Sequence, residues 1–146
     1  MSREIKFRAR RIDSENWVYG FVIEKYGKCY ISHEVSMKSS VGRKKVWVET
    51  EVVKDTVCQY TGLKGRNGKE IYESDFYETA GGIYQIFFKN GAFCGGKNIE
   101  NCAPLGWDCE ENGYDEYNGE MCEGDFFNEI EVIGNIYENA DLLIKN

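Results

Sequence analysis

The side chains that could do chemistry are six cysteines, a single histidine and many carboxylates. No Cys-x-x-Cys pair occurs, whereas a zinc site usually takes two of its ligands from one tight turn. His33 could serve as a base for Cys58, but nothing in the sequence marks that thiol as activated. We therefore expect reduced thiols, no metal site, no cofactor and no enzymatic activity.

One acidic stretch comes close to the pattern of a calcium-binding loop. Asp108, Glu110 and Asn112 occupy the first, third and fifth positions of such a loop, and Gly113 occupies the sixth. The twelfth position requires a bidentate glutamate and is Gly119 in this chain. The stretch is better interpreted as a turn-rich loop, with calcium binding left open.

Charge is distributed unevenly between the two parts of the chain. Residues 1–97 hold 17 Lys or Arg against 12 Asp or Glu, whereas residues 98–146 hold one lysine against 13 acidic residues, and the net charge is −7. Such a segment could neutralise the basic part of its own chain, bind a cation, imitate a nucleic-acid backbone or attract a basic partner.

We favour a partner protein as the ligand of the acidic segment. Aromatic residues lie among the acids, and these are the residue types that anchor interfaces. The predicted partner is a host or phage protein with a basic surface. The predicted protein-binding residues are Trp107, Asp108, Glu110, Glu111, Tyr114, Asp115, Glu116 and Tyr117.

Two alternatives place binding on the basic part of the chain. A nucleic acid could lie along a basic strand face and stack on aromatic residues (Trp17, Tyr19, Trp47 and Tyr60), although a pI near 4.9 disfavours this ligand. A small anionic ligand could instead be held between the subunits of a homo-oligomer. The residues predicted to bind an anion or nucleic acid are Lys6, Arg8, Arg10, Arg43, Lys44 and Lys45.

The elements that must position these residues are mostly strands, because apolar and polar residues alternate with a period of two. Turn signals at Tyr26-Gly27, Asn67-Gly68 and Asn90-Gly91 predict hairpins. We expect a mobile loop over residues 36–45, an acidic loop insertion at about 95–125, and a helical turn only at 139–144. The expected strands lie near residues 5–9, 17–23, 28–32, 46–53, 83–89 and 129–137.

No stretch approaches the roughly 20 apolar residues of a membrane span. The first residues are charged where a signal peptide would be apolar, so we expect no export.

Three blocks of the chain have distinctive sequences: Arg3 to Ala9, the stretch from Gln59 to Asp75 that contains QYTGL and NGKEIYESD, and Val132 to Asn139 with the sequence VIGNIYEN. Together these blocks resemble the YopX-like family of phage proteins. Compared with that family, Gly65 replaces Asp, Ser74 replaces Gly and Ala140 replaces Pro.

The resemblance implies a phage or prophage origin and a small, partly open β-barrel, with one domain over residues 1–146. It implies location in the host cytoplasm, and it names no catalytic residues. The central block is interpreted as scaffold: Tyr60, Leu63, Ile71 and Tyr72 would fill the barrel wall, and Asp75 would cap a turn. A non-enzymatic binding module is therefore the expected function.

Overall fold

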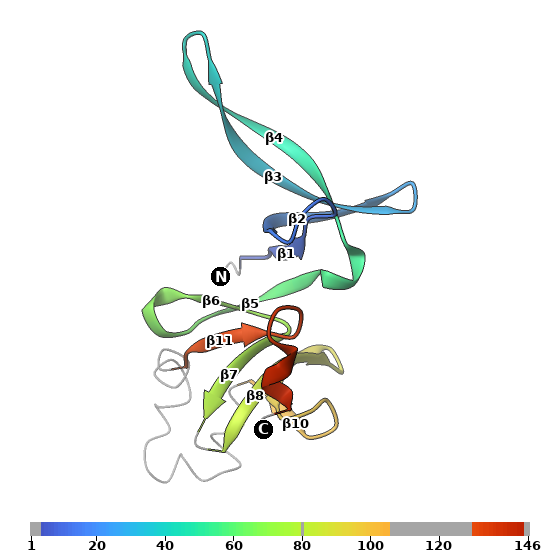
Figure 1. Cartoon of the computed structure of the whole chain (residues 1–146), viewed down its shortest axis with the longest axis vertical. Coiled ribbons are helices and arrows are strands. Elements are labelled where there is room, and N and C mark those ends of the chain that lie inside the picture. The colour runs from blue at the N-terminus through green and yellow to red at the C-terminus, as the bar shows by residue number, and fades with distance from the viewer. Residues whose placement is uncertain (1–3, 80, 106–129, 145–146) are drawn as a thin grey trace. The chain divides into compact units, whose positions relative to one another are not determined.

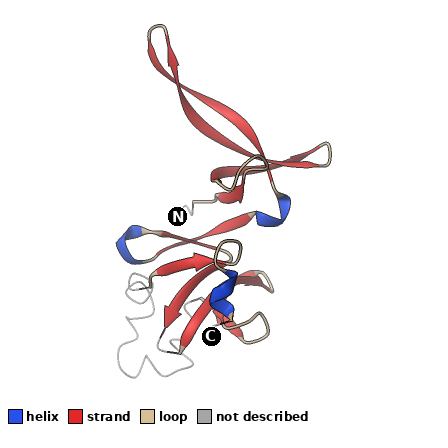
Figure 2. Cartoon of the chain, in the orientation of Figure 1, coloured by secondary structure: helices blue, strands red, loops and turns tan. Residues whose placement is uncertain are grey.

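The computed structural model describes residues 4–79, 81–105 and 130–144. These residues form eleven β-strands and three short 3₁₀ turns, so the predicted mainly β fold with little helix is confirmed (Figure 2). The chain divides into two compact units, Met1–Tyr60 and Thr61–Asn146. Each unit is described by itself, and the expectation of a single domain stays a prediction. No helix among the described residues has the length and apolar character that a membrane crossing requires.

The first unit is an antiparallel sheet with the strand order β4-β3-β2-β1-β5. Strand β5 runs on past Tyr60 into the second unit, where its neighbour is β6. A 3₁₀ turn, η1 (Lys54–Thr56), connects β4 to β5. The strands are β1 (Phe7–Arg10), β2 (Trp17–Lys25), β3 (Lys28–Ser39), β4 (Gly42–Val52) and β5 (Cys58–Lys64).

One face of this sheet forms the core of the first unit, as the alternation of residues predicts. Ala9, Val18, Ile31 and Val52 come from four different strands and pack together in one buried cluster. The backbone also bridges Arg11 to Val52, which links the end of β1 to the end of β4. The sheet therefore curls back on itself, in agreement with the predicted partly open barrel.

The structure contradicts the mobile loop predicted for residues 36–45. Strands β3 and β4 pair continuously from Cys29 opposite Val52 to Ser39 opposite Gly42, and together they form a long two-stranded ribbon (Figure 1). The Ser39 hydroxyl donates a hydrogen bond to the Gly42 carbonyl oxygen at 2.7 Å across the turn. The segment has few apolar residues, so its strand structure comes from the ladder of backbone hydrogen bonds and not from burial.

The second unit contains an antiparallel sheet with the order β10-β9-β8-β7-β11. Its core is a cluster of buried residues that includes Ile71, Tyr77 and Ile86. Two 3₁₀ turns, η2 (Arg66–Gly68) and η4 (Ala140–Leu143), lie at the predicted Asn67-Gly68 turn and in the predicted C-terminal helical turn. The strands are β6 (Glu70–Tyr72), β7 (Asp75–Thr79), β8 (Gly82–Lys89), β9 (Ala92–Gly96), β10 (Cys102–Pro104) and β11 (Val132–Asn135).

The central sequence block has the scaffold role that the resemblance implied. Of the four residues predicted to fill the wall, Tyr60, Ile71 and Tyr72 are buried, and Leu63 is partly buried against the cluster that contains Ile71. The carboxylate of Asp75 is also buried and accepts a hydrogen bond from the Tyr72 backbone N–H at 2.8 Å. Asp75 therefore fixes the turn between β6 and β7, because a buried backbone donor needs a partner.

Candidate functional site

Four aromatic side chains lie on the face of the first sheet opposite its core. Trp17, Tyr19 and Phe21 alternate along β2, and the pairing through β3 places Trp47 of β4 on the same face. We call Trp17, Tyr19, Phe21 and Trp47 the aromatic face. Gly20 lies between two of these residues, and a Cβ atom there would collide with the Ser32 carbonyl oxygen of β3. This glycine permits the close approach of β2 and β3 behind the aromatic face.

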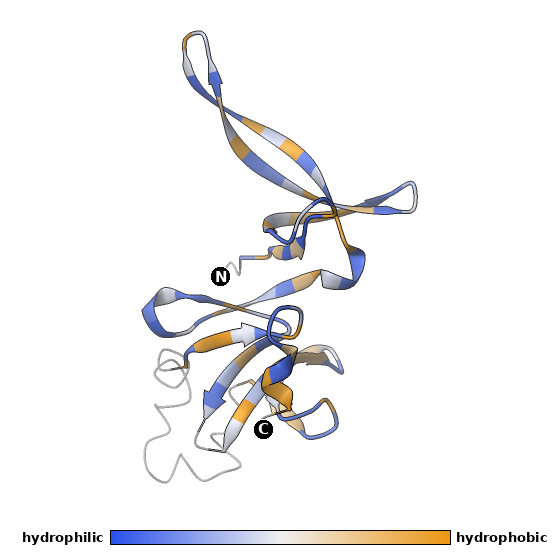
Figure 3. Ribbon diagram, viewed as in Figure 1, coloured by the Kyte–Doolittle hydropathy of each residue, from blue (hydrophilic) through white to orange (hydrophobic). Residues whose placement is uncertain are grey.

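Three of these four rings are open to solvent. Tyr19 is 48% exposed, Phe21 is 52% exposed and Trp47 is 61% exposed. The rings of Phe21 and Trp47 lie 6.2 Å apart between centroids with an interplanar angle of 31°, and so form a tilted pair. Hydrophobic positions alternate with hydrophilic ones along β3 and β4 (Figure 3). A neighbouring group of exposed aromatic residues is a typical binding surface.

Arginine side chains cover the Trp17 end of the aromatic face. The Arg8 guanidinium lies 4.7 Å from the centroid of the Trp17 ring, and that of Arg10 lies 6.0 Å away. Arg8, which was predicted to bind an anion or nucleic acid on a basic strand face, is buried, with only 7% of the residue exposed. A flat, weakly hydrated guanidinium loses little hydration free energy when it stacks on an indole ring. Burial of Arg8 against Trp17 is therefore favourable.

Lysines neutralise the carboxylates on this face of the sheet. Glu34 lies 3.9 Å from the Lys45 ammonium group, and Glu51 lies 3.5 Å from that of Lys28. A third glutamate, Glu49, pairs with Lys25. These acids therefore give the face little net negative charge that would repel an anionic ligand.

A shallow groove of about 380 Å³ runs beside the aromatic face, and Trp17, Tyr19, Trp47 and His33 are among the residues that line it. The His33 ring nitrogen Nε2 lies 2.8 Å from the Thr50 hydroxyl oxygen. Burial, and to a smaller extent the positive charge of Arg11, lowers the pKa of His33. A catalytic histidine usually has a carboxylate that stabilises its charged form, and the charge that acts on His33 has the opposite effect.

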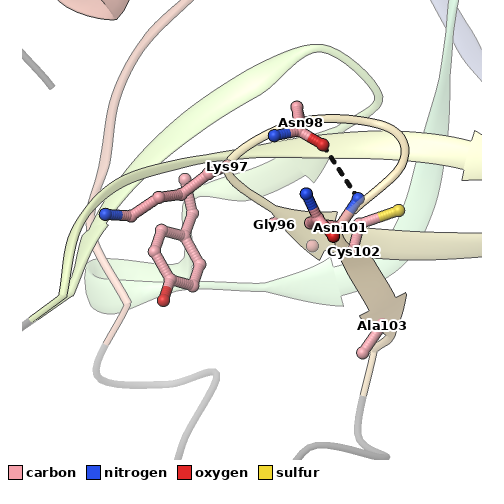
Figure 4. A pocket seen from close by; sticks show the side chains of 8 residues that line it. Gly96, Lys97, Asn98, Asn101, Cys102 and Ala103 are labelled. Atoms are coloured by element: carbon pink, nitrogen blue, oxygen red, sulfur yellow. Dashed lines mark hydrogen bonds between the residues drawn. The ribbon is translucent and has the colours of Figure 1, made fainter.

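A second pocket of about 510 Å³ lies in the second unit, near the end of β9 and the loop that follows it. Lys97, Asn98 and Asn101 line it (Figure 4). The Asn98 side-chain oxygen accepts hydrogen bonds from the backbone N–H groups of Glu100 at 3.1 Å and Asn101 at 2.8 Å. That oxygen therefore holds the loop in shape, and Lys97 is the one charged side chain among the described residues that line the pocket.

The predicted site residues have different outcomes. The predicted acidic loop at about 95–125 is described only up to residue 105, and that part contains the end of β9 and all of β10, so the loop prediction is wrong there. The predicted protein-binding residues lie outside the described residues: Trp107, Asp108, Glu110, Glu111, Tyr114, Asp115, Glu116 and Tyr117. Tyr60, predicted to stack on bases, is buried with the Lys6 ammonium group 5.1 Å from its ring centroid. Arg43, Lys44 and Lys45 are exposed on the ribbon.

Sequence reasoning missed two residues of this surface. Phe21 belongs to the aromatic face, and Lys38 is the partner of Arg43 across the ribbon. The signal for Phe21 was available, because it follows Trp17 and Tyr19 at the same two-residue interval. Lys38 was missed because an interpretation of its segment as a loop does not place it opposite Arg43.

The cysteines in the part of the chain that the structure describes are free thiols. Cys29, Cys58 and Cys94 are buried free thiols, and Cys102 is a partly exposed one. Burial raises the pKa of Cys94, and the neighbouring Cys102 adds to this effect. A raised pKa reduces the thiolate fraction on which nucleophilic attack depends. The two remaining cysteines lie outside the described residues.

Comparison with known proteins supports the resemblance seen in the three sequence blocks. No curated protein matches the chain. The model of the family described as "YopX protein" matches residues 6–144, which is nearly the whole sequence. The chain therefore belongs to the YopX family.

Proposed function

We propose that the protein is a non-enzymatic binding module and that its aromatic face holds a single-stranded nucleic acid. One observation carries the proposal. Three solvent-exposed rings lie on one face of a sheet, with Arg10 beside one end and the cationic part of the ribbon beyond the other. Proteins that bind single strands without sequence preference combine aromatic rings that stack on bases with cations that follow the phosphates.

The arrangement suits bases better than a small ligand. Side chains two residues apart on one strand are separated by roughly 7 Å, so Tyr19 and Phe21 would each meet a different base. Trp47 lies on another strand and widens the stacking surface. The groove beside these rings is shallow, whereas small ligands are usually enclosed in a cavity. Stacking does not discriminate between bases, so we expect little sequence preference.

The local charge also supports an anionic ligand, although the whole chain is acidic. Residues 1–60 contain 12 Lys or Arg against 8 Asp or Glu. Glu34, Glu49 and Glu51, which lie on the face of the aromatic rings, each have a lysine partner. A phosphate backbone that approaches this face therefore meets unpaired cations of the ribbon and few unpaired carboxylates.

We propose that the protein has no enzymatic role because the surroundings of its single histidine, His33, suit a structural hydrogen bond. His33 has the Thr50 hydroxyl as its hydrogen-bond partner, and burial together with Arg11 favours its neutral form. This environment suits a structural hydrogen bond, because a general base must be able to hold the proton that it takes up.

A partner protein is the second candidate for the same surface. Tyrosine, tryptophan and arginine are the residues that most often dominate the energy of protein interfaces, and Tyr19, Trp47 and Arg10 are of these types. The partner could be a host protein, a phage protein or a second copy of this chain. Salt separates these ligands from a nucleic acid, because binding to phosphates weakens steeply with added salt and an apolar contact does not.

The test is fluorescence anisotropy with a labelled oligo-deoxythymidine of about 15 nucleotides, which covers the usual size of such sites. We expect the wild type to bind and the variants Phe21→Ala and Trp47→Ala to bind more weakly. Each lost stacking contact should cost about 1–3 kcal/mol, or roughly a 5- to 150-fold rise in Kd. The variants should unfold at the same temperature as the wild type, since both side chains are largely exposed.

Tyr26→Asn is the matched control. Tyr26 is 93% exposed in the β2–β3 turn, and asparagine tolerates its positive φ of 54°. The control should therefore bind like the wild type. Two results would overturn the proposal: no binding at low salt, or equal weakening by Tyr26→Asn and Trp47→Ala. A dimer in sedimentation experiments that Trp47→Ala dissociates would support self-association through this face instead.

A further inference from the structure

We propose that the end of the β3–β4 ribbon binds the backbone of a nucleic-acid duplex. The preferred ligand is then a junction, in which the single strand on the aromatic face continues into a duplex at the ribbon. This inference rests on the proposed function and adds the class of ligand to it. We call residues 36–45 the ribbon tip.

The ribbon tip is a purely cationic surface. It contains Lys38, Arg43, Lys44 and Lys45 and has no Asp or Glu, and all four of these side chains are exposed. Lys45 pairs with Glu34 at 3.9 Å. Lys38, Arg43 and Lys44 have no acidic partner among the residues that the structure describes. These three unpaired cations at the end of the two-stranded ribbon are free to contact phosphates.

The shape of the tip is that of an arm. Strands β3 and β4 are paired up to Ser39 and Gly42, so the two backbones run side by side to the turn (Figure 1). The turn lies six residues beyond Trp47, which corresponds to roughly 20 Å along a strand. The major groove of B-form DNA admits a two-stranded ribbon of this kind. The tip can therefore contact a duplex while the aromatic face holds a single strand.

The composition of the ribbon tip favours a duplex as its ligand over a continuation of the single strand. Residues 36–45 contain no aromatic residue, so the surface that could stack on unpaired bases ends at Trp47. In a duplex the bases are already stacked, and the phosphates dominate affinity. Two serines of the tip (Ser36 and Ser40) add hydroxyl donors for phosphate oxygens. Met37 is 55% exposed and Val41 is 96% exposed, which adds apolar surface that can contact thymine methyl groups in the major groove.

The experiment compares two variants that remove the same charge from different places. The tip variant carries Lys38→Gln, Arg43→Gln and Lys44→Gln. The control carries Lys64→Gln, Lys69→Gln and Lys97→Gln, which are exposed lysines of the second unit. Affinity is measured between 50 and 200 mM salt for an oligo-deoxythymidine strand, for a blunt duplex, and for a junction of the two.

We expect the wild type to bind the junction more tightly than the single strand. The slope of log K against log salt should decrease in magnitude by about 2.7 for the tip variant with the junction, since each duplex phosphate contact contributes about 0.9. Over that salt range the difference corresponds to roughly a 40-fold change in affinity. With the single strand, whose phosphates also approach the ribbon cations, the slope of the tip variant should decrease by less than with the junction, and the control should keep the wild-type slope.

Several results would overturn the inference. One is a wild type that binds the single strand as tightly as the junction. A second is a tip variant that keeps the wild-type slope, in which case the lysines only discourage pairing at an exposed strand edge. A third is a wild type that binds polyglutamate as tightly as the junction, which would indicate that the ribbon tip binds acidic proteins. Failure of the wild type to bind the single strand would instead refute the proposed function itself. Melting temperatures of both variants should equal that of the wild type.

Discussion

Replacement of Ser74 by glycine should stabilise the protein. Ser74 has a φ of +73°, a left-handed conformation that costs residues with a Cβ atom energy. Its backbone cannot relax easily, because its N–H donates to the Ile86 carbonyl at 2.8 Å and its carbonyl accepts from Ile136 N–H at 3.1 Å. The hydroxyl group makes no hydrogen bond to another described residue. The left-handed conformation of Ser74 is therefore strained, and no side-chain hydrogen bond to another described residue compensates for that strain.

The expected size of the effect follows from two opposing contributions. Removal of the Cβ atom relieves about 1–2 kcal/mol of left-handed strain. Glycine also increases the conformational entropy of the unfolded chain, which costs about 0.4–1 kcal/mol. Ser74→Gly should therefore raise the free energy of unfolding by about 0.5–1 kcal/mol. For a chain of this length the melting temperature should rise by roughly 1–4 °C.

The assay is urea unfolding followed by circular dichroism, with Ser74→Val as the companion variant. Valine is β-branched and tolerates positive φ poorly, so Ser74→Val should shift the unfolding midpoint to lower urea. The slope with urea should be the same for all three proteins, because the variants leave the buried surface unchanged. A lower midpoint for Ser74→Gly would show that the strain at this turn is not the dominant contribution.

Two further variants test the core of the second unit and the environment of His33. Gly95→Ala should lower the free energy of unfolding by about 1–3 kcal/mol in urea titrations, because the added Cβ would overlap the buried Tyr77 hydroxyl; wild-type stability would contradict the packing. His33 has a lowered pKa in the folded protein, so the unfolded chain takes up a proton more readily and stability should fall as the pH drops below about 6.5. The variant His33→Gln can still bond Thr50, and unfolding at pH 7.5 and 5.5 should show that it removes this part of the pH dependence of stability. An unchanged pH dependence would contradict the lowered pKa of His33.

Local features of the fold were predictable from the sequence. Tyr26-Gly27, Asn67-Gly68 and Asn90-Gly91 all adopt the positive φ angles that their turns require. The strands that flank them carry the period-two pattern, and most of the predicted segments are strands. The same pattern could have added Phe21 to the aromatic face. These features are determined by residues that lie close together in the sequence, so they can be predicted from one sequence.

Features that depend on distant neighbours were not predictable. The tip of the ribbon has no hydrophobic period, and its strands exist because each half has the other as a hydrogen-bond partner. Alternation places Arg8 on the outer face but does not reveal that Trp17 covers it. The distribution of the strands over two sheets follows from which strands pair, and pairing between distant segments leaves no local pattern.

The central claim is that the rings of the aromatic face contact bases. The most direct measurement is fluorescence of a protein whose only tryptophan is Trp47, made by Trp17→Phe and Trp107→Phe. We predict that titration with oligo-deoxythymidine quenches the emission of Trp47, with the same midpoint as the anisotropy titration. An oligonucleotide that binds this protein and leaves the emission of Trp47 unchanged would contradict the claim.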